Sequence, residues 1–191
     1  YANVGVNWSS SAETTLGLYV NDIDQELAGA VSLVDALASP RIASPTSVAG
    51  DWRRDLNSQR VFATTTFRFG SSEVRFGGSY SHKTLFHPVP VLLDQESKLY
   101  TGVLSYQGEA ALGNVPVAWT AGLRYRGTDL DGRVFLNFGG SPGQLIGGSR
   151  QRSSSVENYG EGRAEVLPRL EDITGGVFAR TLRDYEDLLD D

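Results

Sequence analysis

The sequence predicts an all-β fold: a segment of an antiparallel transmembrane β-barrel of about eight strands, with short periplasmic turns and long extracellular loops. Three observations lead to this prediction. Apolar and polar residues alternate with a period of two through much of the chain. The connections between alternating segments are short and long in turn. No stretch reaches the ~20 apolar residues of a membrane helix, whereas a barrel strand needs about 9–11 residues, of which every second one is apolar.

The alternating segments form four successive pairs, each joined by a short turn. In the first pair, Val4, Val6 and Trp8 share one face of a strand, and Leu16 and Leu18 share one face of its partner. The four pairs are 2–9 with 14–23, 60–69 with 73–81, 100–106 with 117–126, and 155–166 with 172–183.

The second pair is the clearest, because both segments alternate strictly on either side of the turn at 70–72. In the third pair, the turn at 113–116 contains Gly, Asn and Pro, which favour turns. The last pair is joined at 167–171, and Gly160 and Gly162 stand where larger apolar residues would be expected.

Long connections are expected at 24–57, 82–97 and 127–154. The first of them contains a helical spacing of apolar residues that begins at 24–26, passes through Leu27, Val31 and Val34, and ends before Pro40. We expect a short helix there that packs on residues of its own loop.

Alternation alone does not distinguish a membrane barrel from a soluble β-sandwich, since each has one apolar and one polar face. Two features favour the barrel. Charged residues recur on the polar faces, as at Arg68, Arg75 and Arg124. Aromatic residues stand near the strand ends, as in the girdles of outer-membrane barrels: Trp8, Phe69, Tyr80, Tyr100, Trp119 and Tyr125. A small self-contained barrel with a structural or adhesive role, and a soluble all-β binding module, remain alternatives.

Composition argues against several functions. The net charge is −6, and the 17 basic residues form no block or stripe, which argues against nucleic-acid binding. Cys is absent, which excludes disulfides, thiolate zinc sites and a Cys nucleophile. The two histidines, His82 and His87, lack further ligands at suitable spacing for a metal site. We therefore expect no enzymatic activity, no catalytic residues, no metal site and no cofactor.

Several segments resemble the strand and turn units of TonB-dependent receptors of the ferric-siderophore branch. The segment 158–170 resembles an alternating strand that ends in a Pro-Arg-Leu-type periplasmic turn. The segments 61–70 and 119–125 are similar units, and 47–56 resembles a return from a loop into a strand. The resemblance covers nearly the whole chain but lies in patterned strands rather than in an invariant signature.

The resemblance implies a bacterial outer-membrane location and a role in importing ferric siderophores or similar metal chelates. It identifies residues 1–191 as part of the receptor's β-barrel domain, with no plug domain and no signal peptide in this chain. Its expected partners are outer-membrane lipid, the chelate and, through a plug domain absent from this chain, the TonB complex.

Three residues within the first long connection are candidates for binding the chelate: Trp52, Arg53 and Arg54. An aromatic ring could stack on an anionic ferric complex, and an Arg fork suits carboxylates. The alternative places Trp52 in an aromatic girdle and both arginines in external salt bridges.

Overall fold

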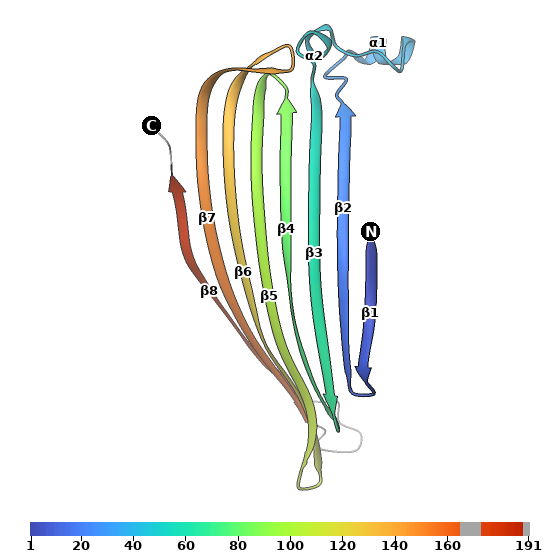
Figure 1. Cartoon of the computed structure of the whole chain (residues 1–191), viewed down its shortest axis with the longest axis vertical. Coiled ribbons are helices and arrows are strands. Elements are labelled where there is room, and N and C mark those ends of the chain that lie inside the picture. Colours follow the sequence, from blue (N-terminus) through green and yellow to red (C-terminus); the bar gives the residue numbers. More distant parts are fainter. Residues whose placement is uncertain (165–172, 189–191) are drawn as a thin grey trace.

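The computed structural model describes residues 1–164 and 173–188, with side chains described for 1–164. The described residues form one antiparallel sheet of eight strands in sequence order, in which each strand pairs with the next along the chain. Figure 1 shows the strands side by side as one long curved sheet, with the helices beyond one end of it. The elements are β1 (Ala2–Ser9), β2 (Ala12–Glu26), α1 (Leu33–Ala38), α2 (Pro45–Ala49), β3 (Arg53–Phe69), β4 (Ser72–Pro88), β5 (Val91–Leu112), β6 (Val115–Phe138), β7 (Ser141–Ala164) and β8 (Ile173–Leu188).

The short turns occur where the sequence predicts them. Gly70 and Gly113 adopt positive φ angles of 60° and 67°, which glycine tolerates without steric cost, and they allow tight hairpins at β3–β4 and β5–β6. The antiparallel sheet and the number of strands agree with the prediction. The predicted turn at 167–171 lies outside the described residues.

The predicted long connections at 82–97 and 127–154 are wrong. Residues 82–88 continue β4, and only Val89 and Pro90 separate it from β5. Likewise, β6 and β7 are long strands separated by Gly139 and Gly140, both with positive φ. The first long connection is real but shorter than 24–57, because β2 ends at Glu26 and β3 begins at Arg53.

The connection 27–52 contains two short helices rather than one helix that starts at 24–26. Ser32 caps α1 by accepting a hydrogen bond from the Asp35 amide, and Ser44 caps α2 in the same way, with Pro45 in the first turn. No residue of α1 is buried, so the expectation that this helix packs on its own loop is also wrong.

The cross-strand register divides the side chains between two faces, because directly opposed residues point to the same side and neighbours along a strand point to opposite sides. The belt face carries Leu18, Val61 and Tyr80, which lie opposite one another on β2, β3 and β4. The polar face carries Tyr19 and Arg60, which lie opposite each other. These two names are used throughout.

A single sheet encloses little core. Among the described residues, the buried hydrophobic side chains are Ala12 and Leu92. Large apolar side chains are instead exposed on the belt face, including Val61 at 50% and Phe67 at 43%. Exposure on this scale indicates an interaction surface, since soluble monomers rarely show large contiguous apolar patches.

Candidate functional site

The belt face carries an uncharged band that crosses the sheet. In β1–β7, no charged side chain lies on this face within residues 2–9, 12–18, 61–69, 72–80, 100–112, 115–127 and 154–164. The segments 61–69 and 72–80 match the about 9–11 residues with which a tilted barrel strand crosses a membrane. We call this band the belt.

Aromatic rings border the belt on both sides. On one side Phe69 stacks on Tyr106, with ring centroids 6.5 Å apart, and Tyr106 lies 6.3 Å from Trp119. On the other side Tyr80 and Tyr100 lie directly opposite each other, with centroids 5.2 Å apart. This arrangement agrees with the girdles expected from the sequence and suits the two interfaces of a bilayer.

Behind the belt, the polar face carries charged side chains, several of which form ion pairs. Arg68 contacts both Glu13 at 2.6 Å and Glu73 at 3.1 Å, and Arg75 contacts Glu73 at 3.0 Å. Farther along the strands, Arg124 lies 3.5 Å from Glu157. Such charges would be costly in hydrocarbon but are compatible with a water-filled lumen.

Beyond the tyrosine border, six strands continue and the polarity of the belt face changes. We call this part the extension; it comprises 19–26, 53–60, 81–88, 91–99, 128–138 and 141–153. Its belt face carries ion pairs between neighbouring strands, such as Asp94–Arg133 at 2.6 Å and Asp131–Arg150 at 2.9 Å. The belt face is therefore charged in the extension, whereas it is uncharged in the belt.

The structure does not bring Trp52, Arg53 and Arg54 into one site. Arg53 and Arg54 are neighbours on β3 and point to opposite faces. Arg53 lies on the belt face, bound to Asp51 and to Asp55. The hydrogen bond to Asp55 raises the pKa of the Arg53 guanidinium above its usual range.

The Arg53 guanidinium also lies over an aromatic ring, with its central carbon 5.3 Å from the centre of the Phe86 ring. These contacts agree with the alternative of an external salt bridge. Arg54, on the polar face, donates a 2.8 Å hydrogen bond to Gln25 and forms no ion pair among the described residues.

Trp52 belongs to a junction of three connections at the helical end of the sheet. The Asn137 side chain donates 2.7 Å hydrogen bonds to the carbonyls of Gly50 and Val89, and it accepts one of 2.8 Å from the Gly140 amide. Asn137 thus ties the β6–β7 turn to the β4–β5 turn and to the connection 27–52, and Figure 1 shows the β6–β7 hairpin bending toward α2. Beside it lies a hollow of about 690 Å³, with Trp52 in its wall.

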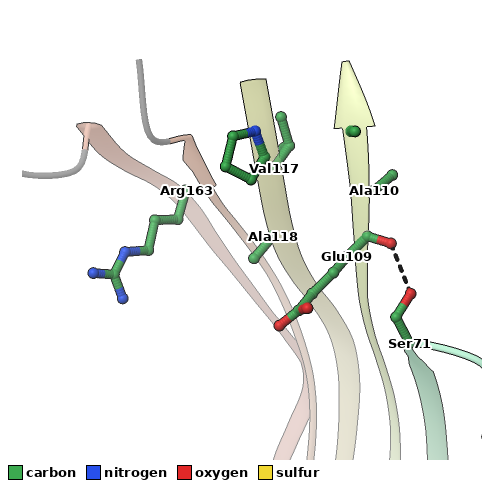
Figure 2. Close-up of a pocket in the computed structure, with 8 residues that line it drawn as sticks. Ser71, Glu109, Ala110, Val117, Ala118 and Arg163 are labelled. Carbon is green, nitrogen blue, oxygen red and sulfur yellow. Dashed lines mark hydrogen bonds between the residues drawn. The ribbon is translucent and has the colours of Figure 1, made fainter. Parts of the chain in front are cut away.

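A second hollow, of about 540 Å³, lies at the opposite end of the sheet beside the β5–β6 hairpin. Glu109, Ala118 and Arg163 line it from three neighbouring strands and share the polar face, because Ala118 is opposite both other residues. Ser71 closes one side by donating a 2.9 Å hydrogen bond to the Glu109 carbonyl (Figure 2).

The two histidines lie apart and have different hydrogen-bond partners. His82 lies on the belt face, with Nε2 3.0 Å from Glu96, whereas His87 contacts the Arg53 carbonyl through Nδ1 at 2.8 Å. In the described part of the chain, no group of three acidic or histidine side chains could hold a metal ion. No helix described here is long and apolar enough to cross a membrane.

Solved structures that share this fold include the following two. The ferric citrate transporter FecA in its unliganded form has a TM-score of 0.74 and 12% identity, and the match covers 95% of this chain and 30% of FecA. The fold is that of part of a TonB-dependent receptor barrel. FpvA of P. aeruginosa, bound to a pyoverdine–iron complex, has a TM-score of 0.71 and 11% identity, with 98% of this chain and 31% of FpvA covered.

The chain thus spans about a third of each solved structure that it matches. No family model matches the sequence, and no significant match is found among curated proteins. The structural similarity supports the resemblance inferred from the strand patterns, and one of the two matched structures, FecA, is a ferric citrate transporter.

The extension is the feature that sequence reasoning missed. The sequence does contain a signal for it: along a strand, the apolar residues change from odd to even positions, or from even to odd, where the extension begins. Within the belt of β3 they occupy odd positions such as Val61, whereas in its extension Leu56 is at an even position. The same change occurs on β4 between Tyr80 and Leu85.

Proposed function

We propose that the chain forms part of the wall of a TonB-dependent receptor that imports a ferric siderophore or a similar metal chelate across the bacterial outer membrane. In this proposal the belt face meets lipid and the polar face lines the lumen. The connection 27–52 and the extension are extracellular, and the turns at 10–11, 70–71 and 113–114 are periplasmic. A plug domain outside the 191 residues would occupy the lumen and couple the receptor to the TonB complex.

The observation that carries the proposal is the uncharged belt between two aromatic borders. Its apolar side chains are exposed, as with Leu104 at 48% and Leu16 at 45%, while the charged residues of the same strands lie on the other face. A soluble binding module would gain nothing from this distribution, because the band would face water. A lipid surface is the environment that makes it favourable.

The open edges favour a larger barrel over a self-contained one. In the described residues β1 pairs with β2 and β8 pairs with β7, so these two strands form the edges of the sheet. Each unsatisfied backbone group in hydrocarbon costs several kcal/mol, about 2–7 by transfer measurements. Further strands that pair with both edges would remove this cost and complete the barrel.

The function is tested by iron uptake in the bacterium that makes the protein. We expect the native protein to fractionate with the outer membrane and to migrate faster on detergent gels before boiling than after it. Under iron limitation, deletion of its coding sequence should abolish uptake of radioactive iron from at least one of three supplied complexes: iron–citrate, iron–catechol or iron–hydroxamate. Unchanged uptake from all three would refute the import function, and recovery in the soluble fraction would refute the barrel.

A further inference from the structure

Charges in the extension are sorted between its two faces. Eight acidic residues of β2–β6 lie in the extension, and the register places every one on the belt face: Asp22, Asp24, Glu26, Asp55, Asp94, Glu96, Asp129 and Asp131. In the extension segments of β2–β7, whose side chains are described, the polar face carries no acidic residue. The sorting is notable because the chain as a whole has a net charge of −6.

The basic residues of the extension differ in the same way. On the belt face all of them form ion pairs: Arg53, Lys98, Arg133, Arg150 and Arg152. On the polar face, Arg54, Arg60 and Lys83 form no ion pair within the described residues. Arg54 donates to the neutral Gln25, and Arg60 donates to Ser79 at 3.3 Å. Three positive charges on one wall are therefore not neutralised by acidic groups of these strands.

An apolar row crosses the same wall among these cations. Ile23, Leu56 and Leu85 lie directly opposite one another on β2, β3 and β4, all half-buried. Arg54 stands two residues from Leu56, and Lys83 two residues from Leu85, on the same face. Two residues along a strand correspond to about 7 Å, so one small molecule can contact both an aliphatic side chain and a cation.

A hollow adjoins this wall near the tyrosine border. It measures about 490 Å³ and is lined by Arg60 together with Tyr1, Tyr19, Ser58, Phe62 and Ser81. Volumes of about 300–1,000 Å³ are typical of sites for small molecules. Aromatic rings, hydroxyl groups and one guanidinium provide stacking, hydrogen bonding and charge in one place.

We propose that the polar face of the extension binds an anionic small molecule that also has an apolar portion. Arg54, Arg60 and Lys83 contact its anionic groups, and the row Ile23–Leu56–Leu85 contacts its apolar portion. The inference rests on the proposed function and deepens it, because it gives the chemical class of the molecule that the lumen receives. Arg53, which the sequence suggested for binding the chelate, is not part of this proposal, because its guanidinium contacts Asp55 and Phe86 on the opposite face.

The charge of the wall can be measured without any ligand, because the 191 residues contain no Cys. Ser97→Cys places a thiol on the polar face opposite Lys83, and Thr84→Cys places one on the belt face opposite Glu96. Methanethiosulfonate reagents of opposite charge are then compared on the native protein in outer membranes. We expect Cys at position 97 to react faster with the anionic reagent and Cys at position 84 with the cationic one.

Variants that remove one charge test whether Lys83 causes the preference for the anionic reagent at position 97. With Lys83 within about 10 Å, Lys83→Gln should lower the anionic-to-cationic rate ratio at position 97 about threefold at low ionic strength. Arg152→Gln, on the belt face of β7, removes the same charge and is the matched control, for which we expect little change at position 97. Equal preferences at positions 84 and 97, or equal effects of the two substitutions, would overturn the proposal.

Protection of the thiol at position 97 then tests binding. The probes are an anionic iron–catechol complex, an uncharged iron–acetohydroxamate complex, and toluenesulfonate, which is anionic and aromatic but contains no iron. Slower labelling with both anionic probes and not with the uncharged one is the expected result, and Lys83→Gln should weaken it. If toluenesulfonate protects the thiol but the protein imports no iron, anion binding by the polar face of the extension is supported and the import function is refuted. If neither anionic probe slows labelling, the proposal that the polar face of the extension binds anions is refuted.

Discussion

Thr64 and Thr65 provide a matched test of which face of the sheet meets lipid. They are neighbours on β3, both half-buried, and they point to opposite faces. Thr65 lies on the belt face, four residues from Phe69, which is about 14 Å along the strand and about 10 Å in depth at a tilt of about 45°. In an apolar band about 25 Å tall, that depth is close to the middle.

Thr65→Arg should therefore destabilise the folded protein by about 2–4 kcal/mol, the cost of Arg at the midplane of a bilayer. That corresponds to a decrease in the folding equilibrium constant of about 30-fold to 1,000-fold. Loss of the 2.9 Å hydrogen bond between the Thr65 and Thr14 hydroxyls adds a smaller cost. Thr64→Arg, on the polar face opposite Thr15 and Gly77, should change stability by less than about 1 kcal/mol.

The assay is equilibrium unfolding in guanidinium of the intact protein refolded into lipid vesicles, followed by tryptophan fluorescence. The difference between the two variants is the informative quantity, because both introduce the same side chain at adjacent positions. Equal destabilisation, or a larger effect of Thr64→Arg, would refute the assignment of the belt face to lipid.

Two further predictions concern the extension. Asn137→Ala removes the side chain that joins three connections, so exchange of the Gly140 amide hydrogen should accelerate by about tenfold, as expected for the loss of one hydrogen bond of about 1.4 kcal/mol; unchanged exchange would show that the junction does not depend on Asn137. The hydrogen bond from Lys98, and after it the hydrogen bond from His82, lowers the pKa of Glu96. The contribution of the ionised Glu96 to folding stability is therefore fully present above the usual carboxyl range, and it is lost as the pH falls through the lowered pKa. The difference in Tm between wild type and Glu96→Gln should consequently shrink between pH 7 and pH 3, and a difference that grows on acidification would contradict this.

The belt segments were predictable because a period of two, tight turns and one dominant apolar face all agree there. Segments 60–69 and 73–81 differ from the observed hairpin by few residues within the belt. The register follows from the short turns, since Gly70 and its neighbour fix which residues of β3 and β4 lie opposite each other.

The extension was not predictable from the same pattern, because the apolar residues change faces where the belt ends and the extension begins. A search for one continuous apolar face ends at Tyr80 and does not connect it with Leu85 on the other face. Pro88 and Pro90 also suggested a loop, although Pro88 is the last residue of β4 and Pro90 occupies the two-residue turn. Because β4–β7 are this long, two-residue turns connect β4 to β5 and β6 to β7, and neither connection is an irregular loop.

The candidate site shows the same limit. In the sequence alone, Arg53 and Arg54 are two adjacent arginines that nothing distinguishes. Only when β3 is known to begin at Arg53 does the alternation of a strand place their side chains on opposite faces. The acidic residues that bind Arg53 are two positions away on each side, at Asp51 and Asp55. The contrast between paired and unpaired cations depends on register across several strands, which local patterns do not provide.

The central claim is that the belt face of the sheet meets lipid while the polar face lines an aqueous lumen. Its most direct test is a spin-label scan of β3 from Val61 to Phe67 in lipid vesicles, using single Cys substitutions and collision with oxygen and with a water-soluble nickel complex. Labels at odd positions should collide mainly with oxygen, labels at even positions with nickel, and a label at position 57 in the extension should become accessible to nickel. Equal nickel access at odd and even positions within the belt would contradict the account.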